Sequence, residues 1–292
     1  MSYQWDLEEK LAEGITRIID EQIDDALAQL TDEGNDRDEA IHSARKSFKK
    51  IRAVLRLVRD QIGDTIYREQ NELYRDLGRA LAPMRDAYVR VMLINKLIDT
   101  LEADHLRSSA ETMRAELVAD YENTRTTFWQ SATTQEVIDR LTDERDTIHD
   151  MPLNKKKAFK VFKKGVKRIH KQGQDEMEIA YQNVPSAVEF HQWRKRVKYL
   201  WYHLRILKPY NPDTIADLID QLDQLGDLLG SAHDFAVLYN TLVEHPETQD
   251  GAGRHLLALL DQQRGELEQQ AYELGEAIYH KRTKHFIKQI KD

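Results

Sequence analysis

The chain has 292 residues, of which 40% are hydrophobic and 32% are charged, and its net charge is −8. It contains 12 glycines, 6 prolines and no cysteine, which excludes disulfides, thiolate metal sites and cysteine nucleophiles and argues against a turn-rich β protein. No segment approaches the roughly 20 apolar residues of a membrane span, and the polar N-terminus is unlike a secretory signal. We therefore expect a cytoplasmic protein.

Apolar residues recur at helical spacing along nearly the whole chain, which predicts an all-α protein of about ten helices. Pro83 lies inside a long helical pattern, from about 67 to 101, and we expect it to kink or split this helix. Clusters of turn-forming residues, most of them with proline, predict the other breaks at 32–38, 142–154, 183–186, 208–213 and 245–253. We find no convincing strand between these breaks.

The basic residues are distributed unevenly, which the net charge conceals. Three segments carry 22 of the 43 lysines and arginines and no acidic residue, namely 41–59, 154–171 and 190–208. Like charges on neighbouring turns of a helix repel by about a few tenths of a kcal/mol per pair, so a helix built only for solubility would interleave glutamates. The three runs therefore favour a binding surface for a polyanion, although the rest of the chain is acidic.

Two of these segments repeat one another, which predicts an internal duplication. At an offset of 149, the residues His42, Arg45, Lys46, Lys49 and Arg56 align with His191, Arg194, Lys195, Lys198 and Arg205. At an offset of 148, the residues Leu77, Gly78, Leu81, Asp86 and Val89 align with Leu225, Gly226, Leu229, Asp234 and Val237. We expect a bundle of four or five helices over 1–151 and a second, pseudo-symmetric bundle over 152–292, which together form one domain.

Each basic segment, built as a helix, places its apolar residues on one face and its cations on the opposite face. Trp193 falls on an apolar face and should pack in the core, whereas Tyr202 projects toward a cationic face. Arginine can bind phosphate by bidentate hydrogen bonds, and lysine can bind it as a point charge. The candidate polyanion contacts are His42, Arg45, Lys46, Lys49, Arg52, Arg56, Lys156, Lys160, Lys163, Lys164, Lys167, His191, Arg194, Lys195, Lys198, Tyr202 and Arg205.

Three kinds of motif occur together in this chain. They are the two His-x-x-Arg-Lys helices, the segments LYRDLGRALAPMRDAYV and LDQLGDLLGSAHDFAV that follow them, and the basic helix KKAFKVFKKGVKRIHK. In combination, over most of the chain, they resemble the CHAD family, the conserved histidine α-helical domain. The resemblance implies two pseudo-symmetric bundles around a basic central cavity or pore that binds inorganic polyphosphate, and association with polyphosphate granules in many members. It implies ligand contacts at the aligned cations of the two histidine helices, joined by lysines of the third basic helix.

The chain departs from the family pattern in ways that predict an asymmetric site. The Arg-Asp pair stands as Arg85-Asp86 in the first half but as His233-Asp234 in the second. The N-terminal helix is acidic, where the counterpart of the lysine-rich helix is expected. Family members are often fused to a CYTH domain, but its alternating glutamates are missing here, so triphosphatase activity is not carried over.

The two motif histidines, His42 and His191, lie on the cationic faces, which favours contact with phosphate or a hydrogen bond between helices. A metal role is disfavoured, because a cationic surround repels a metal ion. The same surround disfavours the imidazolium until phosphate arrives, so we expect binding to strengthen as pH falls. We expect Asp86 and Asp234 to orient an arginine or lysine, and Gly78 and Gly226 to permit close helix packing.

These observations predict a non-catalytic module that binds polyphosphate and needs no cofactor or metal. Two alternatives stay open. The first is a hydrolase or kinase that acts on polyphosphate with magnesium held by carboxylates. The second is a nucleic-acid-binding protein, which we rank last because the acidic remainder of the surface repels a stiff duplex. The sequence predicts no membrane association and identifies no protein partner.

Overall fold

The computed structural model describes residues 3–153, 157–182, 186–249 and 251–291. Within these ranges the chain forms eleven α-helices, two short 3-10 helices and no strand, which confirms the all-α prediction. The α-helices are α1 (Leu11–Thr31), α2 (Arg37–Ile62), α3 (Asp64–Ala80), α4 (Ala82–Thr100), α5 (Asp104–Gln130), α6 (Thr133–His149), α7 (Ala158–Gln182), α8 (Ala187–Leu207), α9 (Pro212–Leu242), α10 (Gly251–Tyr279) and α11 (Thr283–Gln289). The 3-10 helices span Lys208–Tyr210 and Pro246–Gln249.

Local chemistry explains where the helices that carry the site begin and end. Asp36 caps α2 by accepting a hydrogen bond from the backbone N–H of Glu39 at 2.9 Å. Gly63 ends α2 with a φ of +86°, a conformation that favours glycine. Leu81 separates α3 from α4, and Pro83 lies in the first turn of α4, so the predicted split of this long pattern is confirmed.

One predicted break is wrong over most of its length. The structure continues α6 as far as His149, whereas we expected helix to stop at about 142. The chain leaves the helix only from Asp150 onward, next to the predicted Pro152. A further break, which was not predicted, lies at 131–132, where Ser131 and Ala132 separate α5 from α6. The hydroxyl of Ser131 donates to the carbonyl of Phe128 at 2.6 Å, a local side-chain bond that competes with continued helix and that composition alone does not reveal.

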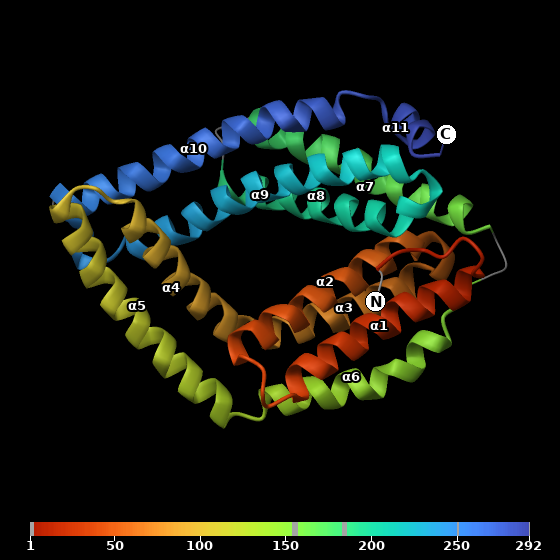
Figure 1. Cartoon of the computed structure of the whole chain (residues 1–292), viewed down its shortest axis with the longest axis horizontal. Coiled ribbons are helices and arrows are strands. Elements are labelled where there is room, and N and C mark those ends of the chain that lie inside the picture. Colours follow the sequence, from red (N-terminus) through yellow and green to blue (C-terminus); the bar gives the residue numbers. More distant parts are fainter. Residues whose placement is uncertain (1–2, 154–156, 183–185, 250, 292) are drawn as a thin grey trace.

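The helices form two groups that lie one above the other in Figure 1. The lower group contains α1, α2, α3 and α6, and the upper group contains α7 to α10 with α11 at its end. The larger hydrophobic core runs through both groups, because α2 packs against α7 and α8. A second core joins α4 and α5 to the end of α9 and the start of α10. Both cores contain residues from before and after position 151, so the division into 1–151 and 152–292 stays a prediction.

Close contacts fix α2 against α7 and α8. Gly165 of α7 lies so near α2 that a Cβ atom there would be 2.4 Å from the backbone oxygen of Leu57. His203 of α8 is fully buried, and its Nε2 lies 2.8 Å from the carbonyl oxygen of Ala53, which can only accept a hydrogen bond. Trp193 is 0% exposed, which confirms its predicted place in the core. These contacts hold the two histidine helices, α2 and α8, next to one another.

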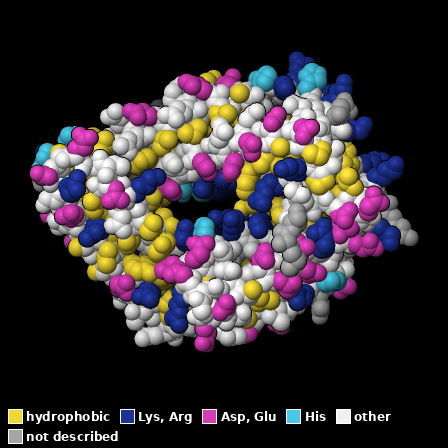
Figure 2. Space-filling view, in the orientation of Figure 1, with side chains coloured by type: hydrophobic (Ala, Val, Ile, Leu, Met, Phe, Trp, Pro, Cys, Tyr) yellow, Lys and Arg dark blue, Asp and Glu magenta, His cyan; other side chains and the backbone are white. Residues whose placement is uncertain are grey.

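Figure 2 shows that the molecule is hollowed near the centre of this face and that lysine and arginine side chains gather around the opening. The ribbons around it in Figure 1 are α2 below, α8 and α9 above, and α4 at the side. We call this feature the central opening. Within the part of the chain that the structure describes, no helix is long and apolar enough to cross a membrane.

Candidate functional site

Cations from several helices meet at the central opening. Lys49 of α2 is close enough to Arg45 of α2, Arg85 of α4 and Arg194 of α8 for their charges to affect its titration. His191 and Lys195 of α8 and His233 of α9 belong to the same group, because Lys49, Arg194 and Lys195 affect the titration of both histidines. We call this set, together with His42 of α2, the central cluster. Its members are His42, Arg45, Lys49, Arg85, His191, Arg194, Lys195 and His233.

Lys49 shows the electrostatic character of the cluster most clearly. Its side chain reaches solvent, but the surrounding protein removes much of its hydration. This loss of hydration, with the charges of Arg45, Arg194 and Arg85, lowers the pKa of Lys49 to about 8. The smaller effect of Asp86 opposes the shift but does not cancel it. A bound anion would offset this repulsion and stabilise the charged ammonium form.

Three histidines of the cluster are neutral at pH 7. The rings of His191 and His233 stack with centroids 4.6 Å apart and planes inclined by 29°. Burial, together with the charges of nearby cations, lowers the pKa of each to about 4. Burial and the charge of Arg85 also lower the pKa of His42. The buried Nδ1 of His191 has no hydrogen-bond partner in the described structure, so one polar atom of the stack is left unpaired.

Few carboxylates oppose these cations. Asp86 of α4 lies 4.0 Å from Nη2 of Arg45, and Nη1 of the same arginine donates to the backbone carbonyl of Gly78. Burial lowers the pKa of Arg45 and of Arg194, so both guanidinium groups are partly desolvated. Burial also raises the pKa of Asp234, despite the opposing charge of Arg194. Asp86 therefore lies beside Arg45, and the charge of Arg194 acts on Asp234, while the expected orienting role of the two aspartates stays a prediction.

Glycines of α9 make room for the cations of α8. A Cβ atom at Gly226 would lie 2.7 Å from Cε and Nζ of Lys198, and one at Gly230 would lie 3.6 Å from the guanidinium of Arg194. Gly226 therefore accommodates a cationic side chain as well as a helix contact. Gly78 differs from this expectation, because a Cβ atom there would meet only Phe48, at an ordinary 3.8 Å. Its visible role is to offer its carbonyl to Arg45.

Arg52 and Arg56 extend the cationic surface of α2 toward α3. Nε of Arg52 and a terminal nitrogen of Arg56 both donate to Oδ1 of Asn71, at 3.1 and 2.6 Å. The guanidinium of Arg56 also lies 4.1 Å from the ring centre of Tyr199 of α8. Their charges affect the titration of Lys195, which places them beside the central cluster.

The remaining candidates of α8 have partners within the protein. Lys198 lies 3.3 Å from Asp223 and 3.6 Å from Asp227. The guanidinium of Arg205 lies 4.6 Å from the ring centre of Trp201. Tyr202 was expected to project toward a cationic face, and the charges of Arg205 and Arg194 do act on it, but it is covered by other residues. Its side chain is only 7% exposed and packs edge-on against Tyr3, because the N-terminal segment folds over this side of α8.

Two lysines of α7 occupy a different surface. Lys164 and Lys167 line a hollow of about 580 Å³ with Arg59, Asp60 and Asp64 at the junction of α2 and α3. Lys160 and Lys163 are also exposed on α7. None of these four is among the residues that perturb the titration of the central cluster in the described structure. We expected these lysines to join the cations of the two histidine helices. The structure places Lys164 and Lys167 at the junction of α2 and α3, and for Lys160 and Lys163 the expectation stays a prediction. Lys156 lies outside the described residues. Lys46, which is exposed on α2, is among the charges that affect His42.

Sequence reasoning missed three members of this surface. Arg85 and His233 occupy matched positions in the two halves. In the sequence, the difference between them indicates only a departure from the family pattern. Asn71 carries no charge, so an argument from basic runs could not find it. The repeat at an offset of 148 points to Arg85 and His233, because these two residues occupy matched positions on the helices that follow the two histidine helices. Among the described residues, no three histidines or carboxylates lie close enough together to hold a metal ion.

The fold and the cluster define a class of helical protein in which two bundles bring cationic helix faces together. The sequence model of the CHAD domain matches residues 17–243, and this chain therefore belongs to the CHAD family. The crystal structure of the CHAD domain from the plant Ricinus communis is similar, with a TM-score of 0.61 and 19% identity over 99% of this chain and 94% of that one.

A second solved structure, PptA from Streptomyces chartreusis, is similar with a TM-score of 0.63. Its sequence is 14% identical, and the alignment covers 94% of this chain and all of that one, 100%. Identities this low show the shared fold alone. A comparison with curated proteins finds no match.

Proposed function

We propose that this CHAD protein binds inorganic polyphosphate at the central cluster and does not change it chemically. The observation that supports this most is the meeting of Lys49, Arg45, Arg85 and Arg194 from three helices, where the pKa of Lys49 falls to about 8. Linear polyphosphate carries a negative charge on every unit of a flexible chain, so it can contact cations on several helices at once. The resemblance to the CHAD family favours the same ligand.

The test is calorimetric titration with long-chain polyphosphate at two salt concentrations, with duplex DNA and tripolyphosphate as comparators. We expect tight binding that favours polyphosphate and weakens steeply with salt, because phosphate neutralisation releases counterions. Absence of binding, or equal binding of every polyanion, would contradict the proposal. Release of orthophosphate in the presence of magnesium would assign an enzyme instead.

Association with polyphosphate granules is the cellular behaviour that such binding supports. A fluorescently tagged chain should gather on granules in cells that accumulate polyphosphate. The same chain with Arg45→Gln and Arg194→Gln should stay dispersed, since both substitutions remove guanidinium groups of the central cluster. If the double variant still associates with granules, the central cluster does not direct the protein to them.

A further inference from the structure

The duplicated halves carry opposite charges at two matched positions. At the offset of 148 that relates the two halves, Arg75 and Arg79 of α3 correspond to Asp223 and Asp227 of α9. Each pair lies on the helix that follows a histidine helix. The surroundings of the central cluster therefore differ between the α3 side and the α9 side, although the cluster itself is built from both halves.

On the α9 side, the cations already have partners. Asp223 and Asp227 both pair with Lys198, at 3.3 and 3.6 Å. Arg205, further along α8, lies against the rings of Trp201 and Tyr3. A phosphate that reached this side would compete with two carboxylates of the protein's own α9.

On the α3 side, two arginines are held without being neutralised. Arg52 and Arg56 share the neutral amide oxygen of Asn71, and Arg56 also stacks on Tyr199. An amide fixes the two guanidinium groups next to one another, but it leaves both positive charges in place. Two fixed guanidinium groups with uncompensated charge form a binding site for phosphate oxygens.

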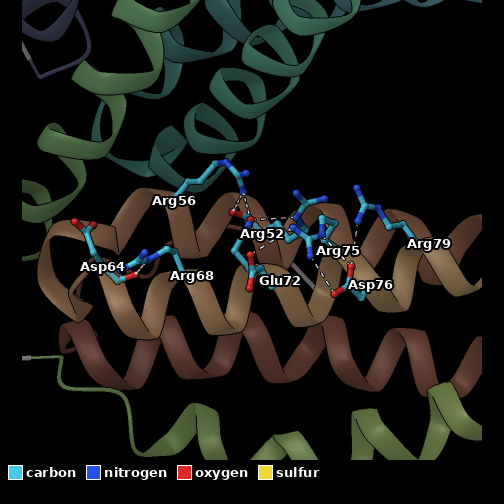
Figure 3. A network of polar contacts seen from close by, with 9 residues as sticks. Arg52, Arg56, Asp64, Arg68, Glu72, Arg75, Asp76 and Arg79 are labelled. Carbon is cyan, nitrogen blue, oxygen red and sulfur yellow. Dashed lines mark hydrogen bonds and ion pairs between the residues drawn. The ribbon is translucent and has the colours of Figure 1, made fainter.

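This pair continues from the central cluster onto the surface. Lys195 connects this pair to the central cluster. Its charge affects the titration of His191 and His233, and the charges of Arg52 and Arg56 affect its own titration. On α3, the residues Asn71, Arg75 and Arg79 are spaced by four and share one helix face. Figure 3 shows Arg56, Arg52, Arg75 and Arg79 following one another along α2 and α3. We call these four residues the arginine row.

The acids beside the arginine row are fewer than its arginines and are exposed. Asp76 lies 2.9 Å from Arg75 and 3.5 Å from Arg79, and Glu72 lies 3.5 Å from Arg75. Each carboxylate side chain is 56% exposed. Asp223 and Asp227 on the α9 side are similarly exposed, at 49% and 78%, and exposed ion pairs contribute little on either side. The two sides therefore differ in their balance of charge. Four arginines beside two such acids leave the row net positive.

We propose that a bound polyphosphate chain leaves the central cluster along the arginine row and not across the α9 side. This inference rests on the proposed function, and it assigns Asn71, Arg75 and Arg79 to the binding surface. It makes affinity depend on ligand length. A short chain fills the central cluster alone, whereas a long chain also contacts the row.

The first test compares two variants that each lose two surface charges. Arg75→Gln with Arg79→Gln removes the outer half of the row, and Arg114→Gln with Arg140→Gln removes two exposed arginines of α5 and α6 as the matched control. For long-chain polyphosphate, we expect the row variant to bind about tenfold more weakly and its logarithmic salt slope to fall by about 1.4, for two lost phosphate contacts. Tripolyphosphate binding should change less than about twofold in either variant.

The second test changes charge on the two sides in opposite directions. Asn71→Asp places a carboxylate between Arg52 and Arg56 at almost unchanged volume and should weaken long-chain binding several-fold. Asp223→Asn with Asp227→Asn frees Lys198 and should strengthen it. The control for the second variant is Asp139→Asn with Asp143→Asn, two exposed residues of α6. Circular dichroism and thermal unfolding verify that each variant is folded.

The outcomes separate this inference from the proposed function. If the wild-type chain binds polyphosphate but the row variant matches its control at every ligand length, the path along the row is wrong and the central cluster stands. If Asn71→Asp leaves long-chain affinity unchanged, the shared amide has no role in binding. If the wild-type chain binds no polyphosphate, the proposed function fails and this inference fails with it.

Discussion

The central cluster and the lysine-rich surface of α7 contain the same types of residue but have different physical properties. Around Lys49, burial and three arginines lower the pKa of the ammonium group to about 8. On α7, Lys164 and Lys167 are exposed and share their hollow with Asp60 and Asp64, and Arg168 pairs with Asp60 at 2.9 Å. In the sequence, basic residues are even denser in the α7 segment, with nine in 154–171, than in the α2 segment, with seven in 41–59. What distinguishes them is whether other helices add cations or carboxylates, and the predictions below test that difference.

The largest effect should come from removing the guanidinium groups of the central cluster. Arg45→Gln with Arg194→Gln should weaken polyphosphate binding about 100-fold, since each charge-assisted contact contributes roughly 1.5 kcal/mol. Both side chains are partly exposed and lie at the opening, so the fold should persist. Calorimetric titration measures the loss, and an affinity within a few-fold of wild type would place the site elsewhere.

The close contact between Gly165 of α7 and Leu57 of α2 should be sensitive to one added methyl group. Gly165→Ala should lower the free energy of unfolding by roughly 1–3 kcal/mol, because the new Cβ meets the backbone of Leu57, which cannot move aside cheaply. Gly226→Ala is the matched control, since its Cβ meets the flexible end of Lys198. Chemical denaturation measures both variants. Equal stability of the two would show that the contact between α2 and α7 tolerates adjustment.

Binding at the central cluster should strengthen as pH falls. The pKa of His191 and of His233 is about 4 in the free protein, so both rings are neutral at pH 7. Bound phosphate raises these pKa values, so the complex takes up protons and affinity rises toward acid by up to about tenfold per pH unit for each proton. We expect about a tenfold gain between about pH 7.5 and about pH 5.5.

The double variant His191→Gln with His233→Gln should flatten this pH profile. Without ligand, the stability of the fold should change with pH in the opposite direction to the binding affinity. The unfolded histidines take up protons near pH 6.5, before the folded ones do, so stability should fall as pH drops from about 6.5 toward 4. Titration calorimetry and denaturation across this range measure both effects, and a flat binding profile in the wild-type chain would exclude the histidines from the site.

The smallest effect should come from the lysines of α7. Lys163→Gln with Lys167→Gln removes two charges, as the double arginine variant does, but from a surface beyond the central cluster. Long-chain binding should change less than about twofold, since salt screens exposed charges beyond about 8 Å. A loss as large as that of the arginine variant would show that polyphosphate bridges both surfaces, as the basic runs in the sequence first suggested.

Helical periodicity and breaker residues predicted most of the fold. They predicted the all-α class and the split at Pro83, because both follow from interactions within a few residues. The break between α5 and α6 was missed, since the side-chain hydrogen bond by which Ser131 helps to end α5 is one that no composition rule reports. Tyr202 shows a different limit of reasoning from one helix. Its direction on the helix was read correctly as near the cations, but the N-terminal segment that covers it was not foreseeable from that helix.

Residue type and helical period are enough to show which residues carry positive charge, which helices repeat and which faces of those helices are polar. Which polar faces meet depends on how the helices pack. The tertiary structure brought α2 and α8 together through the close approach of buried groups such as His203 and Ala53, and it added Arg85 and His233 from the partner helices. It also placed Lys164 and Lys167 of α7 at the junction of α2 and α3. Whether cations or carboxylates surround a given charge depends on residues distant in the sequence, and helix packing determines which of those residues lie nearby.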